Sequence, residues 1–265
     1  MKSNWLCPAV LSVFLSFALV GCGKKQGTSE VPGSQSAMSG AYVDAATAGS
    51  ISGTVQLDGV APRMKSINMA AEPACAKQHA APVTSQEVLI GKNGALENVV
   101  VYLKGDFSQY KFDAAQAPVT ITQKGCMYDP HVLVLETGQS LQVVNADPVT
   151  HNIHPLPKDN REWNESQPPG AAPIDRSFPH EEIAIPVKCN IHPWMKAYIA
   201  VFNHPYFTVT GKDGSFELKN VPPESYTMVA WHELYGTNEQ LVTIGSKESK
   251  TLHITFHASS AARGS

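Results

Sequence analysis

The sequence lacks the short motifs that identify several common classes of cofactor and catalytic site. It contains no His-x-His pair, no Cys-x-x-Cys-His, no His-Glu-x-x-His and no Gly-x-Ser-x-Gly. These absences argue against a trinuclear copper cluster, covalently bound haem, a zinc protease and a serine hydrolase of the nucleophile-elbow type.

Positive charge is also scarce. The chain carries 20 Lys and Arg against 23 Asp and Glu, a formal net charge of −3, and the basic residues form no stripe. Nucleic-acid binding needs clustered positive charge, so we expect no nucleic-acid partner. The charge balance is compatible with soluble protein partners.

Helical periodicity is nearly absent, whereas short β-type runs recur. The turn signals between the runs are pairs such as Asp58-Gly59, Thr137-Gly138 and Asp213-Gly214, in which Gly tolerates a positive φ. This pattern predicts an all-β chain. The runs are residues 51–57, 98–103, 119–122, 132–135 and 141–144.

A long apolar run, residues 6–20, follows a basic residue at the N-terminus. It ends at Leu19-Val20-Gly21-Cys22, which resembles a bacterial lipobox. We therefore expect residues 1–21 to be a lipoprotein signal peptide, too short for a lasting membrane span, and Cys22 to carry lipid. The residue after Cys22 is Gly23 and not the Asp that favours retention of a Gram-negative lipoprotein at the inner membrane. The predicted location is the cell envelope, as an outer-membrane lipoprotein facing the periplasm or the cell exterior.

The next segment, residues 22–49, is rich in Gly, Ser, Ala, Gln and Thr and has no hydrophobic period. Such composition is typical of a flexible tether. Its root-mean-square reach is about 30 Å, taking roughly 5–6 Å times the square root of its length. The membrane is thus an expected partner through the lipid on Cys22.

A single short stretch contains three soft or borderline metal ligands. Cys189-Asn190-Ile191-His192-Pro193-Trp194-Met195 places a thiolate, an imidazole and a thioether close together. A type 1 copper site uses Cys, two His and a weak axial Met, so a second His must come from elsewhere. Asp147-Pro148-Val149-Thr150-His151-Asn152 supplies one. The two motifs predict one copper ion as the cofactor.

Over roughly residues 111–203, these linked motifs resemble the cupredoxins, the type 1 blue copper proteins that include plastocyanin. The spacing Cys-x2-His-x2-Met, with Pro after the His, is most similar to the ligand loop of amicyanin. The resemblance implies a Greek-key β-sandwich over residues 109–203. It implies His151 as the upstream ligand, with His154 as the competing candidate, and Asn152 joining the two ligand loops. The implied ligand set is His151, Cys189, His192 and Met195.

The resemblance also assigns roles to the other residues of the ligand loop. Amicyanin has Pro where this chain has Ile191, whose free N–H allows a second hydrogen bond to the thiolate. His192 is expected to be partly exposed, with Pro193 and Trp194 forming an apolar collar for partner docking. Core packing is the alternative for Trp194. The implied partner is a redox protein of the cytochrome or dehydrogenase class.

The strand before this loop alternates. Ile183, Ile185, Val187 and Cys189 share one face by the period-two rule, so the thiolate is expected to point inward. The other histidines are not expected to bind metal. His131 and His180 are assigned surface or packing roles, and His232 is assigned a structural role in a strand.

Cysteine counting leaves one candidate pair. Of five cysteines, Cys7 leaves with the signal peptide, and Cys22 and Cys189 already have roles. An exported protein lives where disulfides persist, so Cys75 and Cys126 are a disulfide candidate. The alternatives are two separate buried thiols, or a second metal site formed by Cys126 and His131.

Residues 208–230 resemble the carboxypeptidase regulatory-like, transthyretin-like β-sandwich, although Glu224-Ser225 departs from the usual turn. This segment is too short for a complete sandwich. Residues 52–59 and 98–103 look like further strands of it. We therefore expect residues 50–108 and 204–258 to build one Ig-like sandwich around an inserted cupredoxin. Domains in plain tandem are the alternative.

The favoured function is a lipid-anchored, cell-envelope blue copper protein that carries single electrons. It is not expected to be an enzyme, because four protein ligands leave no open metal position. One alternative is copper binding and buffering without redox turnover. The other is a metal-free adhesion or carbohydrate-associated module.

Overall fold

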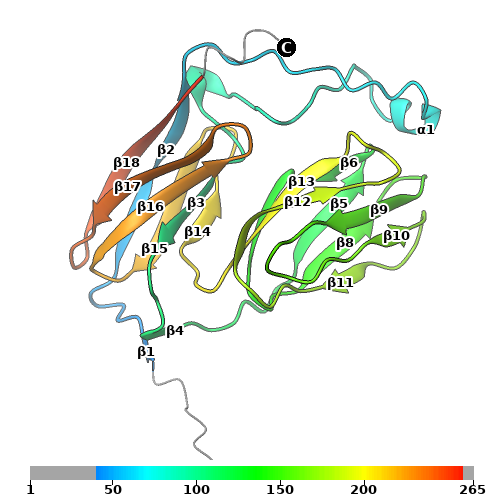
Figure 1. The fold of residues 1–265 in the computed structure, drawn as a ribbon. Helices are drawn as coiled ribbons and strands as arrows, with labels where there is room; N and C mark the ends of the chain where they lie inside the picture. The colour runs from blue at the N-terminus through cyan, green and yellow to red at the C-terminus, as the bar shows by residue number, and fades with distance from the viewer. Residues whose placement is uncertain (1–39, 259–265) are drawn as a thin grey trace, which may run out of the picture. The chain divides into compact units, whose positions relative to one another are not determined.

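The computed structural model describes residues 40–258, and within them the fold is all-β, as predicted (Figure 1). The predicted signal peptide, the lipidation site Cys22 and most of the predicted tether lie outside the described residues. Among residues 40–258, no helix is long and apolar enough to cross a membrane.

Strands from both ends of the described chain share two sheets. One sheet has the order β14 (Phe207–Val209), β3 (Val100–Lys104), β16 (Ser225–His232) and β17 (Gly236–Thr243). The other has the order β15 (Ser215–Val221), β2 (Gly49–Asp58) and β18 (Ser249–His257). We call these two sheets the outer sandwich.

The strands β5 to β13 form two further sheets, which we call the inner sandwich. The larger sheet has the order β10 (Glu165–Gln167), β9 (His151–Pro155), β12 (Glu182–Lys188), β13 (Lys196–Phe202) and β7 (Val132–Glu136). The smaller has the order β11 (Ile174–Arg176), β8 (Leu141–Asn145), β5 (Val119–Lys124) and β6 (Met127–Asp129). The inner sandwich is thus inserted in sequence between two strands of the outer one.

Each sandwich has its own hydrophobic core. The outer core includes Val55, Leu103 and Met228, and the inner core includes Ile121, Leu141 and Ile199, all fully buried. Alternation produces these cores, because successive strand residues face opposite sides of a sheet. A third cluster, Val100, Val132, Ala200 and Phe202, joins residues of both sandwiches.

Four short elements complete the fold. The helix α1 (Pro73–Ala76) and the 3₁₀ turn η1 (Lys92–Gly94) lie between β2 and β3. The strand β1 (Ala41–Tyr42) pairs in parallel with β4 (Tyr110–Lys111). Since β1 falls inside the predicted tether 22–49, the C-terminal part of that segment is ordered rather than flexible.

The predicted alternation of β12 is wrong at one residue. Ile185, Val187 and Cys189 are buried in the inner core, as expected. Ile183 instead packs against the cluster shared by the two sandwiches. A bulge at Ala184, with φ of 63°, shifts the pairing of β12 with β13 between Glu182 and Ile185. A bulge adds one residue and so reverses the face that precedes it.

The segment 67–83 follows β2 but does not join the outer core. Met69 and Cys75 are buried in the inner core, and Ile67 and Val83 pack against it. The backbone N–H of Ile67 donates to the carbonyl of Val83, at 2.8 Å. We call this segment the cover segment. It brings residues that the sequence assigned to the Ig-like sandwich to the inner sandwich.

Replacing Leu103 with Ala should destabilise the protein by about 2–5 kcal/mol, because Leu103 is fully buried in the outer core and its loss leaves a cavity. The measurement is urea unfolding. The matched control is Leu241→Ala on β17 of the same sheet, where the side chain is 79% exposed. Its effect should stay within about 0.5 kcal/mol. Equal losses would contradict this packing.

Two buried histidines predict acid sensitivity. Burial lowers the pKa of His204 to about 4; burial and the charge of nearby His131 lower that of His232 to about 4 as well. The unfolded chain therefore binds more protons below the ordinary pKa of 6.5. Stability is full above pH 6.5 and falls as the pH approaches 4. The expected loss is about 3 kcal/mol per histidine.

The check is the unfolding free energy measured across this pH window for the wild type and His204→Asn. The variant should lose less stability on acidification than the wild type. The control is His257→Asn, whose side chain is 74% exposed, and which should keep the wild-type slope. A wild-type stability that did not change over the window would refute the prediction.

Candidate metal centre

The loop between β8 and β9 is built to deliver His151. The side-chain oxygen of Asn145, at the end of β8, accepts the backbone N–H of Asp147 at 3.0 Å. Its amide nitrogen donates to the carbonyls of Val149 (2.9 Å) and Gln167 (2.8 Å). These bonds fix a local Asx-type turn. His151 begins β9 at the end of this turn and is fully buried.

The second ligand loop is a seven-residue connection between β12 and β13. Lys188 pairs with Lys196, which closes the loop at its base. Within it, the N–H of Met195 donates to the carbonyl of His192 at 2.9 Å, and the N–H of Cys189 donates to the carbonyl of Met195 at 3.3 Å. The bonds hold Cys189, His192 and Met195 on one compact turn.

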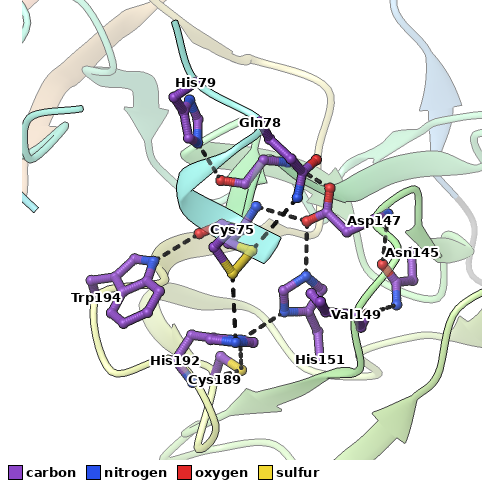
Figure 2. Close-up of a disulfide and its surroundings, with 12 residues drawn as sticks. Cys75, Gln78, His79, Asn145, Asp147, Val149, His151, Cys189, His192 and Trp194 are labelled. Carbon is purple, nitrogen blue, oxygen red and sulfur yellow. Dashed lines mark hydrogen bonds and ion pairs between the residues drawn. A yellow bond between two sulfur atoms is a disulfide. The ribbon is translucent and has the colours of Figure 1, made fainter. Parts of the chain in front are cut away.

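Three of the predicted ligands converge (Figure 2). The Nδ1 atoms of His151 and His192 are 2.9 Å apart, and the Cys189 Sγ is 3.8 Å from His192 Nδ1. The three ligand atoms all lie within 4.8 Å of one another, and all three residues are buried. Met195 is fully buried in the same core. A thiolate and two imidazoles in this arrangement fit a trigonal copper site.

Asn152 ties the two ligand loops together. Its side-chain oxygen accepts the backbone N–H of Asn190 at 2.7 Å and the thiol of Cys189 at 3.3 Å. Its amide nitrogen donates to the Asn164 side-chain oxygen at 2.7 Å. The hydroxyl of Tyr128 donates to the Asn152 carbonyl at 2.6 Å. The loops are therefore locked to one another by a buried amide.

The thiol is stabilised as a thiolate. Burial raises the pKa of Cys189, but the hydrogen bond from His151 and the backbone N–H groups of Asn152, His192 and Ile191 outweigh it and hold the pKa below its ordinary value. The N–H of His192 lies 3.4 Å from the sulfur. Cys189 is the free cysteine of residues 40–258.

The two imidazoles have opposite environments. Burial lowers the pKa of His151, but the hydrogen bond to Asp147 and the nearby negative groups outweigh it, so the pKa is raised. Burial, followed by the charge of His151, lowers the pKa of His192. His192 therefore favours its neutral form, the form in which a histidine binds a metal.

A disulfide between Cys75 and Cys126 lies directly against this site. The Sγ of Cys75 is 3.7 Å from Nε2 of His192 (Figure 2). The expectation that His192 is partly exposed is wrong: its residue exposure is 1%. The cover segment supplies Cys75, so it closes the edge of His192 that was expected to face solvent.

The residues flanking His192 differ in their environments. Trp194 is half-buried, its ring centroid is 5.2 Å from that of His192, and its indole N–H donates to the Cys126 carbonyl at 3.0 Å. Pro193 is exposed, and Ile191 is 46% exposed. Trp194 thus packs and bonds within the site, while Ile191 and Pro193 form its outer surface.

The other histidines that the sequence singled out have partners of their own or are exposed. His154 bonds to Glu162 at 2.6 Å and to Asn190 at 3.3 Å. His131 bonds to the Lys196 carbonyl and to Glu233. His232 accepts the N–H of Leu234, and His180 is exposed. Because Cys126 is in a disulfide, its sulfur is not free to bind a metal with His131.

Sequence reasoning missed two contributors. Asp147 was recognised as part of a turn, but its carboxylate also accepts from His151 Nε2 at 2.8 Å. The spacing of four residues was the one available signal. The cover segment gave no signal, because only the fold shows that residues near Cys75 reach the inner sandwich.

No family model matches the chain, and no curated protein matches it. Several solved structures are similar to parts of it. A Cu-containing nitrite reductase (NirK) from Thermus scotoductus SA-01 is 22% identical, with a TM-score of 0.30, over 32% of this chain. The match covers 22% of the reductase, well under two thirds of its length.

Two smaller proteins are matched over most of their own length. A mutant amicyanin in the Cu(I) form is 16% identical, with a TM-score of 0.28, over 34% of this chain and 86% of amicyanin. A purple cupredoxin from Nitrosopumilus maritimus is 21% identical, with a TM-score of 0.27, over 34% of this chain and 99% of that protein.

Opening the Cys75–Cys126 disulfide should lower stability by about 3–4 kcal/mol, because the bond closes a loop with a sequence separation of 51. The measurement is urea unfolding with and without a dithiol reductant. A Cys75→Ser, Cys126→Ser double variant should match the reduced wild type and respond no further to reductant. A wild type with the same stability in both conditions would contradict the prediction.

Proposed function

We propose that this protein is a copper protein that carries single electrons, with His151, Cys189, His192 and Met195 as the ligands. The observation that carries the proposal is the convergence of two imidazole nitrogens and one thiolate in a buried site. This donor set suits both Cu(I), which favours soft sulfur ligands, and Cu(II), which favours imidazole.

The described residues fit copper and the demands of electron transfer. Copper supplies the one-electron couple; the protein supplies a site that changes little between the two states. Asn152 fixes one loop against the other. Burial of Cys189 and His192 excludes water from the ligand atoms. Hydrogen bonds to the thiolate withdraw charge from sulfur and so tune the reduction potential.

The exit for electrons lies on the outer face of the ligand loop. His192 itself is buried, but its neighbours Ile191 and Pro193 are exposed. A redox partner of the cytochrome or dehydrogenase class would meet this face. Electron-transfer encounters use small interfaces, so the small exposed surface formed by Ile191 and Pro193 is sufficient. Trp194 is half-buried against His192, and its indole N–H donates to the carbonyl of the disulfide residue Cys126.

The proposal includes a location at the cell envelope. A lipid on Cys22 would hold the chain at the outer membrane, and the residues before β1 would give it reach. The outer sandwich then acts as a carboxypeptidase regulatory-like, transthyretin-like scaffold for the copper domain. No catalytic role is proposed, because four protein ligands leave no coordination position for a substrate.

Copper buffering without redox turnover uses the same ligands and is the main alternative. A buffering site has to take up and release metal readily. The burial of His192 beneath the disulfide opposes that, so the closed site favours electron transfer.

The test of the proposal is the visible spectrum of the Cu(II)-loaded protein. A thiolate bound to Cu(II) should give an intense visible band that a one-electron reductant such as ascorbate bleaches. Cys189→Ser should abolish this band, since it removes the only free thiolate of residues 40–258. His151→Gln should also abolish it.

The matched control for His151 is His154→Gln, on the same strand β9. His154 bonds to Glu162 instead of facing the site, so this variant should keep the band. Loss of the band in His154→Gln with retention in His151→Gln would reassign the upstream ligand. A wild type that binds Cu(II) without an intense band would favour buffering, and one that binds no metal would favour the adhesion module.

A further inference from the structure

The Cys75–Cys126 disulfide lies beside a ring nitrogen of His192 that the candidate metal centre does not use. The Sγ of Cys75 is 3.7 Å from Nε2 of His192 (Figure 2). Nδ1 of the same ring faces His151 and Cys189 instead. The ligand atoms of Cys75, Cys126 and His192 all lie within 4.8 Å of one another, and all three residues are buried. Breaking the disulfide would therefore place two thiols against an imidazole.

The spacing of these atoms fits a metal ion. In a tetrahedral site, a metal–sulfur bond of about 2.3 Å and a metal–nitrogen bond of about 2.0–2.1 Å place sulfur and nitrogen about 3.6 Å apart. The separation between Cys75 and His192 is close to this value. Soft thiolate ligands select Cu(I). Two thiolates and one imidazole are therefore a suitable donor set for Cu(I).

Contacts outside the disulfide would keep Cys126 in place once the bond is broken. Its carbonyl accepts the indole N–H of Trp194 at 3.0 Å, and its backbone N–H donates to Asp147 Oδ2 at 2.7 Å. The side-chain nitrogen of Gln78 is 3.8 Å from the Cys126 Sγ. A hydrogen bond from this amide would stabilise the thiolate, because hydrogen bonds to a charged form favour that form.

One short helix separates the disulfide from solvent. Cys75 is the buried residue of α1, whereas Pro73, Ala76 and Lys77 around it are exposed. Local opening of a short surface element costs less free energy than global unfolding. Such an opening at α1 would give a small dithiol access to the two sulfur atoms.

The reduction is an ordinary thiol–disulfide exchange. A thiolate of the dithiol attacks one sulfur of the disulfide and forms a mixed disulfide, and the second thiol of the reductant then displaces the protein. Two electrons and two protons pass to Cys75 and Cys126, and the reductant leaves as a disulfide. Metal binding then releases the two thiol protons, because the thiolate is the ligand.

We propose that Cys75, Cys126 and Nε2 of His192 form a second metal site, for Cu(I), which becomes available when a dithiol reduces the disulfide. The inference goes beyond the proposed function, since the second site uses neither Cys189 nor Met195. It gives the disulfide a role in metal binding in addition to its role in stability.

His192 would link the two sites, since each uses a different nitrogen of its ring. A neutral imidazole has one nitrogen with a free lone pair. A metal on Nε2 would leave the proton on Nδ1 and so withdraw His192 from the candidate metal centre, where the other three ligands would remain. Reduction of the disulfide would thereby weaken the binding of copper at that centre.

The first test counts Cu(I) ions per chain in the wild type. The copper-free protein is reduced with a dithiol, separated from it by gel filtration without oxygen, and mixed with Cu(I) and a competing Cu(I) chelator. Native mass spectrometry should find one Cu(I) more on the reduced protein than on the oxidised protein. Equal numbers would overturn the inference. An oxidised protein that binds no Cu(I) would overturn the proposed function, whatever the reduced protein binds.

The matched control is the Cys75→Ser, Cys126→Ser double variant, taken through the same steps. It keeps every other cysteine of the chain, so Cu(I) bound by those cysteines would be seen here as well. The variant should bind the same number of Cu(I) ions before and after the dithiol treatment. A gain equal to that of the wild type would place the additional ion elsewhere and overturn the inference.

The role of His192 is tested in the reduced Cys189→Ser variant, whose candidate metal centre has no thiolate. Adding His192→Gln should lower its Cu(I) affinity by at least about 10-fold, because changes outside the ligand shell already cost about 10- to 100-fold. The control is His79→Gln, since His79 belongs to the cover segment but bonds to the Gly125 carbonyl. It should keep the affinity. Equal losses in the two variants would remove His192 from the second site.

Discussion

The candidate metal centre depends on the two-residue turn Gly125–Cys126, which is bonded to four other residues. Its N–H groups bind the Asp147 carboxylate, and its carbonyls bond to His79 and Trp194. Its side chain is joined to Cys75. Through these contacts the turn reaches both histidines of the site, His151 by way of Asp147 and His192 by way of Cys75 and Trp194. A change in this turn would therefore alter the surroundings of both His151 and His192.

Burial of the site has an energetic cost that the hydrogen bonds offset. Asp147, His151 and Cys189 would each lose hydration in the core, and an uncompensated buried charge is costly. Burial raises the pKa of Asp147, but the bonds from His151, Cys126 and Gly125 outweigh it and keep the pKa below its ordinary value. The carboxylate therefore stays charged. The hydrogen bonds thus hold the Asp147 carboxylate, the His151 imidazole and the Cys189 sulfur together within an apolar core, an arrangement suited to binding a cation.

The sequence allowed much of the local structure to be predicted. Runs of alternating residues identified β2, β5, β7 and β8, because the two-residue period of a strand is visible in one segment. Ligand spacing within the loop from Cys189 to Met195 was likewise local. Pro186, two residues after Ala184 in the same strand, signals a disrupted ladder, but the position of the bulge depends on the pairing of β12 with β13. This is why Ile183 was placed on the wrong face.

The burial of His192 was beyond sequence reasoning for a different reason. Cys75 lies 117 residues before His192, and nothing in the residues near α1 indicates which core they join. Predicting a Cys75–Cys126 disulfide identifies the contact between the two cysteines, but it does not show that the disulfide packs against His192. Asp147 shows the same limit. Its closeness in sequence to His151 was visible, but the turn that orients its carboxylate belongs to a different hairpin.

The parallel pairing of β2 with β18 joins residues that are 199 positions apart, as in the contact of Asp58 with His257. The outer sandwich therefore cannot close until the final strand has been synthesised. Every strand of the inner sandwich precedes residue 203, so it has all its partners earlier. Its folding would draw β3 and β14 together and shorten the loop whose closure costs entropy. The inner sandwich would thus act as a folding template for the outer sandwich, which encloses it in sequence.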